Sequence, residues 1–134
     1  MFDRLANAGL RPTRKREALA ALLFNGNGCH VTAEQLYSEA AAAGIKISLA
    51  TVYNTLHTFT NYGLLKEVVV EPGCSFFDTN VSEHSHFYLE ETRQLIDIPE
   101  EMGIILCLPQ PPAGTLISRV DLIIRIKTSQ GRAA

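Results

Sequence analysis

Three segments that each open with a helix-capping residue constrain the fold of this chain more than any other feature. Thr13, Thr32 and Ser48 each precede a run in which apolar residues recur at helical spacing. Gln35 follows Thr32 by three residues, which is a capping-box pattern. Gly44 stands where a C-terminal cap is expected. The first part of the chain is therefore predicted to form three short helices.

The third segment, "SLATVYNTLHTFTNYGLL", has two faces of different chemistry. One face is an apolar stripe, and the other presents small or polar side chains: Ala50, Thr51, Asn54 and Thr58 against Leu49, Val52, Leu56 and Phe59. A solvated amphipathic helix shows the same periodicity, and the pattern alone leaves both interpretations open. The polar face lacks the Glu and Lys usual in a solvated helix. Small side chains, amides and a tyrosine suit a helix that approaches base edges in the major groove of DNA.

The next stretch, "LLKEVVVEPGCSFFD", reads as two strands joined at Pro72-Gly73. Three helices followed by a hairpin is the order of a winged helix-turn-helix. The predicted class is thus α+β. Basic residues near the N-terminus, among them Arg11, Arg14 and Lys15, are expected to contact phosphates.

Charge is unevenly distributed in this chain of 134 residues with net charge −2. Residues 1–30 hold five basic residues and two acidic ones, a balance of +3. Residues 67–101 hold nine carboxylates against Arg93 alone, a balance of −8. This asymmetry indicates an anionic partner for residues 1–30 and a cation for residues 67–101.

Composition narrows the class of protein further. With 46% apolar residues the chain can bury a core, and it shows neither a long apolar run nor a leader, so we expect a soluble, cytoplasmic, unprocessed protein. The three cysteines are far apart and form no CxxC pair. Buried free thiols are therefore expected, not a disulfide framework or a cysteine-rich zinc site.

The stretch "EHSHFYLEETRQLID" places two histidines one residue apart. Along a strand His84 and His86 share a face. If a hairpin turns around Glu91-Thr92, Asp97 lies opposite His86 on that face; this holds for loops of two or four residues and fails for three. Two imidazoles and a carboxylate suit Fe, Mn or Zn. Surface histidines that bind no metal remain the alternative from this stretch alone.

The last segment, "TLISRVDLIIRIK", follows a proline-rich connector and alternates like a strand with one buried face. Val120, Leu122, Ile124 and Ile126 alternate with Asp121, Arg125 and Lys127. Three short strands without a long helix make a thin core. A homodimer that shares this sheet is therefore predicted.

Several of these motifs together resemble the ferric uptake regulator family. "GLRPTRKREALAALL", "HVTAEQLY", "KISLATVYNTL", "GLL" and "FDTNVSEHSHF" match that family in order and spacing over residues 1–98. The resemblance implies a metal-responsive transcription regulator with a winged-helix domain, expected at residues 1–80, and a small α/β dimerisation and metal-sensing domain, expected at 81–134. The chain looks most like the iron response regulator branch, and its ligand spacing is also similar to the peroxide-sensing branch.

The resemblance also implies site residues. The family's regulatory metal site falls on His30, at the start of the second helix, and on Asp78, His84, His86 and Asp97. For DNA, the minor-groove basic residue falls on Arg11 and the base-reading tyrosine on Tyr53. The spacing places Tyr53 beside the apolar stripe, so a lateral contact is expected. The full DNA-contact set comprises Arg11, Arg14, Lys15, Ser48, Ala50, Thr51, Tyr53 and Asn54.

The chain departs from the family at three places. Leu89 and Thr92 stand where many members have a CxxC, and no later cysteine pair exists, so no structural zinc held by four cysteines is expected. The long helix usual between the last strands is cut short by Pro109, Pro111 and Pro112. Cys107 is followed by leucine and not by the proline of a heme-regulatory motif, so heme would have to use His84 and His86.

The sequence thus predicts a homodimeric, DNA-binding, metal-dependent repressor of iron homeostasis genes, with about one divalent metal per protomer. It is not expected to be an enzyme. A first alternative is a peroxide sensor, in which Fe(II) generates oxidants that attack its own ligands. A second is a small metal-dependent hydrolase, but nothing resembles a general base in a concave pocket, and the third helix would be unexplained.

Overall fold

A computed structural model of the chain describes residues 2–26, 28–82, 84–99 and 107–129. It divides into two compact units, Met1–Ser82 and Glu83–Ala134. The division falls two residues after the predicted boundary at 80/81. Among the described residues, no helix is long and apolar enough to cross a membrane.

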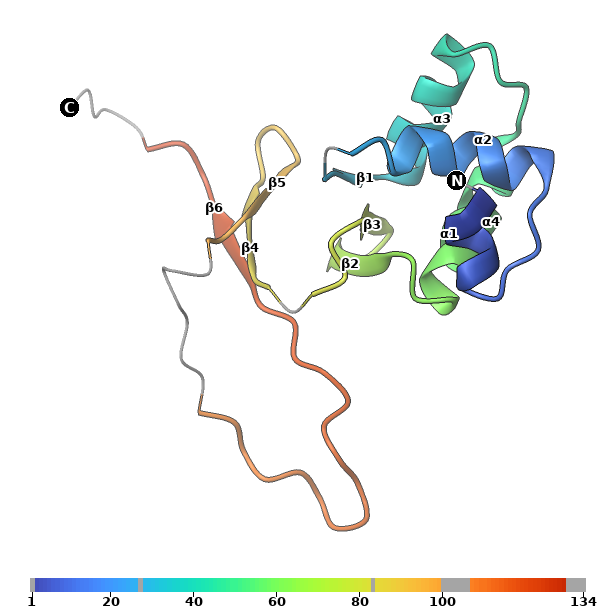
Figure 1. Ribbon diagram of the computed structural model, residues 1–134. Helices are drawn as coiled ribbons and strands as arrows, with labels where there is room; N and C mark the ends of the chain where they lie inside the picture. Colours follow the sequence, from blue (N-terminus) through green and yellow to red (C-terminus); the bar gives the residue numbers. More distant parts are fainter. Residues whose placement is uncertain (1, 27, 83, 100–106, 130–134) are drawn as a thin grey trace. The chain divides into compact units, whose positions relative to one another are not determined.

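The described residues of the first unit form four helices (Figure 1): α1 Phe2–Asn7, α2 Arg14–Leu23, α3 Ala33–Ala42 and α4 Leu49–Asn61. The three predicted caps are confirmed. Thr13 accepts a hydrogen bond from the Arg16 amide at 3.2 Å, and Thr32 forms the predicted capping box with Gln35. Ser48 begins α4. The sequence did not predict α1, because six residues are too few to show helical periodicity.

A three-stranded antiparallel sheet completes the first unit. Its strands are β1 His30–Val31, β2 Lys66–Glu71 and β3 Cys74–Asp78, in the order β1-β3-β2. The predicted hairpin at Pro72-Gly73 is confirmed, and Gly73 has a φ of 78°, which favours glycine at this turn. The prediction that His30 opens the second helix is wrong. His30 lies in β1, two residues before the cap Thr32, and a two-residue strand leaves no pattern in the sequence.

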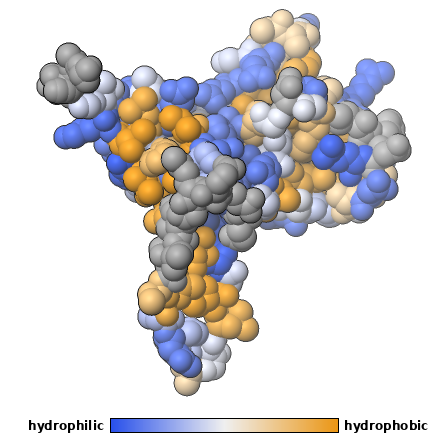
Figure 2. All heavy atoms as spheres, turned by 60° about the vertical axis from the view of Figure 1, so that its left-hand side comes forward, coloured by the Kyte–Doolittle hydropathy of each residue, from blue (hydrophilic) through white to orange (hydrophobic). Residues whose placement is uncertain are grey.

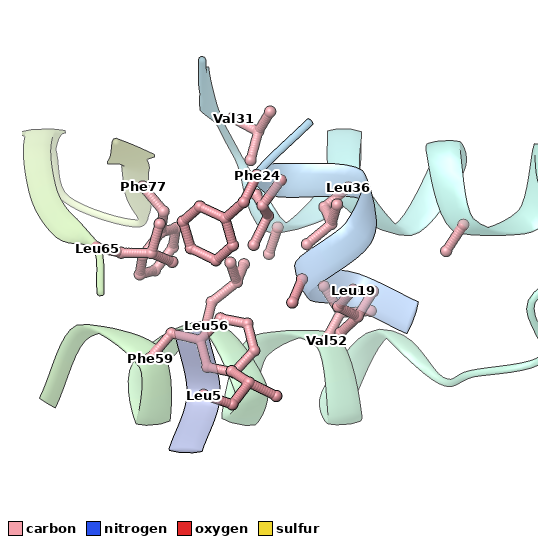
Figure 3. Packing of buried hydrophobic residues seen from close by; sticks show 14 of the residues in the cluster. Leu5, Leu19, Phe24, Val31, Leu36, Val52, Leu56, Phe59, Leu65 and Phe77 are labelled. Carbon is pink, nitrogen blue, oxygen red and sulfur yellow. The ribbon is translucent and has the colours of Figure 1, made fainter. Parts of the chain in front are cut away.

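The helices and the sheet of the first unit enclose one apolar core (Figure 3). From α4, the stripe residues Val52, Leu56 and Phe59 are fully buried, as predicted. From β3, Phe77 is also fully buried, and Phe24 packs against Phe59 with ring centroids 6.3 Å apart. Burial of this stripe fixes which face of α4 remains accessible. The three predicted helices and the hairpin form the expected winged helix-turn-helix.

The second unit contains β4 His86–Leu89, β5 Gln94–Asp97 and β6 Ile123–Ile126, in the order β5-β4-β6 (Figure 1). β4 and β5 are antiparallel, and His86 pairs directly with Asp97. The loop between them comprises residues 90–93, which is the four-residue case of the predicted register. Arg93 has a φ of 55°, the left-handed conformation that closes this loop. The predicted hairpin is therefore confirmed.

The strand predicted near the C-terminus is shorter and more exposed than expected. Only Ile123–Ile126 form β6, which runs parallel to β4. Val120 and Ile124 are 38% and 36% exposed, so the prediction of a buried face is wrong for the single chain. Apolar side chains also reach the surface elsewhere in this unit (Figure 2), including Leu116 at 81% exposure. Residues 107–122 contain no helix, and the preceding residues 100–106 lie outside the described part.

The three cysteines are free, as predicted, but their burial differs. Cys29 and Cys74 are half-buried, whereas Cys107 is exposed. The prediction of a buried thiol is wrong for Cys107, because the connector that carries it has no packed core to enter.

Candidate metal centre and nucleic-acid interface

Two imidazoles and one carboxylate converge in the second unit. The Nε2 atoms of His84 and His86 lie 3.4 Å and 3.2 Å from Oδ1 of Asp97. The two histidine rings lie 4.4 Å apart between centroids. One ligand atom from each of the three residues lies within 4.8 Å of the others.

The hairpin register produces this convergence. His86 is the first residue of β4 and Asp97 is the last residue of β5, and the two are directly paired across the ladder. His84 precedes β4 by one residue and reaches the same carboxylate oxygen. The imidazoles are largely buried, with side-chain exposures of 10% and 3%, whereas Asp97 is 51% exposed. A cation can therefore approach this cluster from the carboxylate side.

The separations of these donor atoms fit a shared metal ion. Ligand atoms that each lie about 2.1 Å from one metal are about 3.0 Å apart at octahedral angles and about 3.4 Å apart at tetrahedral angles. The distances from Asp97 Oδ1 to the two imidazole nitrogens, 3.2 Å and 3.4 Å, fall within that range. Two histidines and one carboxylate also leave coordination positions open and suit Fe(II), Mn(II) or Zn(II).

The first unit brings together the other two predicted ligands. His30 in β1 pairs directly with Asp78 in β3, so their side chains share one face of the sheet. Asp78 is only 2% exposed, and its Oδ1 accepts a hydrogen bond from the Asn80 amide at 2.9 Å. On the other side of β3, Asp78 pairs with Lys66, which is 9% exposed. The Asp78 carboxylate therefore lies on the middle strand between an imidazole and a cationic side chain.

Cys29 neighbours this pair in sequence, and its surroundings shift the pKa of its thiol. Burial raises the pKa of its thiol, and the carboxylates of Glu39 and Asp78 raise it further, while a hydrogen bond with Thr79 acts in the opposite direction. In the absence of metal, this raised pKa favours the neutral thiol of Cys29 at neutral pH.

The accessible face of α4 carries the side chains predicted to read DNA. Ala50 and Asn54 are exposed, and Thr51 is half-buried. The Ser48 hydroxyl is engaged in the cap, since it accepts from the Thr51 amide at 3.1 Å and donates to Thr51 Oγ1 at 2.9 Å. Ser48 therefore has a structural role whether or not it also contacts a partner.

The predicted basic residues lie at the surface before and at the start of α2. Arg11, Arg14 and Lys15 are all exposed. The Arg16 guanidinium donates to the backbone oxygen of Arg11 at 2.7 Å. This contact fixes the backbone at Arg11 while the Arg11 side chain extends into solvent.

Tyr53 lies at the edge of the α4 stripe, where it is half-buried against the core. Its ring stacks on His57, with centroids 6.0 Å apart and an interplanar angle of 17°. His57 was not among the predicted site residues. The only signal for it in the sequence is the spacing of four residues between two aromatic rings on one helix.

Comparison with protein families gives one match that covers most of the chain. Residues 7–104 match the ferric uptake regulator family. A peroxide-responsive repressor of Staphylococcus aureus is 33% identical over 93 residues, which span 69% of this chain and 62% of that protein. The matched segment thus covers less than two thirds of the length of such relatives.

Solved structures of similar fold include three regulators. The ferric uptake regulator of Vibrio cholerae has a TM-score of 0.74 at 22% identity, over 95% of this chain and 98% of that one. The Pseudomonas aeruginosa ferric uptake regulator with manganese has a TM-score of 0.69 at 22% identity, over 95% and 96%. The Campylobacter jejuni peroxide stress regulator has a TM-score of 0.58 at 20% identity, over 96% and 93%. These likenesses establish the fold. The iron response regulator branch stays a prediction.

Proposed function

Because this chain belongs to the ferric uptake regulator family, whose members are transcription regulators and not enzymes, we propose that it is a metal-dependent repressor that binds DNA as a homodimer. The genes it controls would be those of iron homeostasis. The observation that carries this proposal is the cluster of His84, His86 and Asp97, whose donor atoms have the separations of a first-row metal site. Such a repressor acts in the cytoplasm, where it has access to DNA.

One metal per protomer would take ligands from both units. His84, His86 and Asp97 supply three, and the His30–Asp78 pair supplies two more. Only residues 79–83 separate Asp78 from His84 in the chain, so the two groups are tethered by a short segment. A metal held by all five favours one relative orientation of the units. This is a differential affinity for one state, which is what metal-dependent regulation requires.

DNA binding would use α4 and the basic residues before it. The polar face of α4 would enter the major groove, and Tyr53 would contact base edges from the side. Arg11, Arg14 and Lys15 would bind phosphates or the minor groove. A two-fold dimer would place two such helices on successive half-sites of the operator.

The homodimer would form through the apolar face of the second sheet. Phe87 pairs with Ile96 on one side and with Ile124 on the other, so the three side chains lie on the face opposite His86. Ile96 and Ile124 are 39% and 36% exposed in the single chain. A three-stranded sheet buries little apolar surface by itself, so a second copy of the chain would cover most of this apolar face.

The test is a DNA footprint with and without metal, on protein whose metal content is measured after purification from its own host. We expect a protected two-fold site that appears only with the metal found in the purified protein. Equal protection after chelation of the metal would contradict a metal-dependent repressor.

A second candidate is a peroxide-sensing repressor, favoured by the 33% identity to peroxide-responsive repressors. Its test is mass spectrometry of the Fe(II)-loaded protein after peroxide, with zinc-loaded protein as control and a Cys107→Ser background that removes the exposed thiol. An added oxygen atom on His30 or His86, together with release of DNA, favours this candidate. Unmodified histidines at peroxide levels that oxidise free methionine favour metal sensing alone.

A further inference from the structure

A short ladder of aromatic rings joins α4 to the sheet of the first unit. His57 lies one helical turn after Tyr53 and stacks on its ring, with centroids 6.0 Å apart. The His57 ring also contacts Phe77 in a T-shaped arrangement, with centroids 5.4 Å apart and an interplanar angle of 87°. Phe77 is fully buried in β3. Both separations and both arrangements are those that aromatic pairs favour.

We propose that His57 is a positioning residue that fixes the ring of Tyr53 in the orientation needed to read base edges. The inference rests on the proposed DNA-binding function. It assigns His57 a role that acts through another residue and not through its own contact with DNA.

The geometry explains why Tyr53 needs such a partner. Its side chain flanks the apolar stripe and is only half-buried, so the core restrains one side of the ring. A residue that reads bases must be held within about 0.5 Å of its productive position, which requires a supporting neighbour. His57 supplies the missing restraint, and the buried Phe77 anchors His57 in turn.

The alternative role for His57 is a direct contact with DNA. The residue is exposed and lies on the helix predicted to enter the groove, so its imidazole could donate to a phosphate or a base. A phenyl ring in place of the His57 imidazole can serve the positioning role but not the direct contact with DNA. Phenylalanine keeps the stack with Tyr53 but has no hydrogen-bonding atom.

The experiment compares binding of metal-loaded protein to two duplexes: the one that wild-type protein selects from a random pool, and a scrambled version of it. For His57→Ala we expect the preference for the selected duplex to fall roughly 2- to 12-fold, the range that corresponds to one aromatic pair. The salt dependence should not change, because no phosphate contact is lost. His57→Phe should stay within about twofold of wild type, since it keeps the stack.

Two further variants separate positioning from independent contact. Tyr53→Ala combined with His57→Ala should lose no more preference than Tyr53→Ala alone, because His57 acts through Tyr53. Tyr37→Ala removes another partly exposed tyrosine, on α3, and serves as the control for general loss of stability. In the absence of DNA, the NMR signals of the Tyr53 ring should shift in His57→Ala and stay close to wild type in Tyr37→Ala.

The possible failures are distinguishable. If His57→Phe loses as much preference as His57→Ala, or if the double variant loses more than Tyr53→Ala, His57 contacts DNA itself and the positioning role is wrong. If Tyr53→Ala loses preference while His57→Ala keeps both its preference and its NMR signals, only the positioning role fails. If wild-type protein selects no duplex at all, the proposed function fails, and this role fails with it.

Discussion

Replacing His30 by alanine tests whether the metal couples the two units. His30 lies in the first unit, where it pairs with Asp78 across β1 and β3. Its side chain is half-buried and makes an edge contact with Phe76, with centroids 6.1 Å apart. The backbone ladder does not depend on the imidazole, so we expect His30→Ala to cost no more than about 1 kcal/mol of folding stability.

The size of the effect on DNA binding follows from the number of ligands. Couplings between two sites are typically about 1–3 kcal/mol, which corresponds to a 5- to 150-fold effect of metal on operator affinity. His30 is one of two predicted ligands in the first unit, the other being Asp78. If each carries half of the coupling, His30→Ala leaves about 0.5–1.5 kcal/mol, or roughly a 2- to 12-fold effect of metal.

The assay measures operator affinity without metal and at saturating metal for wild type and His30→Ala, with a dimer assay beside it. Asp97→Ala is the matched control, because Asp97 belongs to the candidate metal cluster and lies in the second unit. That variant should need more metal to respond, whereas His30→Ala should show a smaller response even at saturation. A full metal effect in a folded, dimeric His30→Ala protein would refute the idea that the metal bridges the units.

Three further predictions concern the metal, the DNA contacts and the fold. We expect about one metal ion per protomer, fully removed by EDTA, because the described residues form a single cluster of histidine and carboxylate ligands; two ions per chain, one resistant to EDTA, would contradict this. Arg11→Ala should weaken binding to all duplexes, and in salt titrations the slope of log affinity against log salt concentration should become shallower by about one. Tyr53→Ala should leave that slope unchanged and reduce only the ratio of operator affinity to affinity for other duplexes. Thr32→Ala should cost about 1 kcal/mol and lower the Tm of the first unit by roughly 4–8 °C in calorimetry, because the Gln35 amide loses the Thr32 hydroxyl that accepts its hydrogen bond, while the backbone amide of residue 32 can still donate to Gln35.

The elements that the sequence predicted are those with strong local signals. Each capping residue precedes a run of residues that is long enough to show helical periodicity. The capping box requires only two residues, Thr32 and Gln35, at a fixed spacing. The pairing of His86 with Asp97 was predictable because a turn and strict alternation together fix a register. The separation of the donor atoms could not be read from the sequence, since it depends on side-chain torsions.

The features that the sequence did not predict are short or depend on distant residues. β1 has two residues, and its pairing with β3 joins positions nearly fifty apart, so neither periodicity nor a turn indicates it. His57 became a candidate only when Phe77 was found against it, and these two residues belong to different elements. The face around Ile124 was predicted to be buried, but alternation indicates an apolar face without saying which chain covers it.

The short strand β3 takes part in both the proposed metal binding and the proposed reading of DNA. Successive side chains of a strand point to opposite faces, so Phe77 and Asp78 lie on opposite sides of the first sheet. Asp78 shares its face with His30, whereas Phe77 enters the core and contacts His57 of α4. A ligand bound at Asp78 therefore restrains the strand whose other face supports the ring next to Tyr53. Because the core on that face is closely packed, a displacement of β3 reaches α4 through contacts and not through a flexible loop. Asp78, the predicted metal ligand, and Tyr53, whose ring we propose to read bases, therefore lie on neighbouring layers of the first unit.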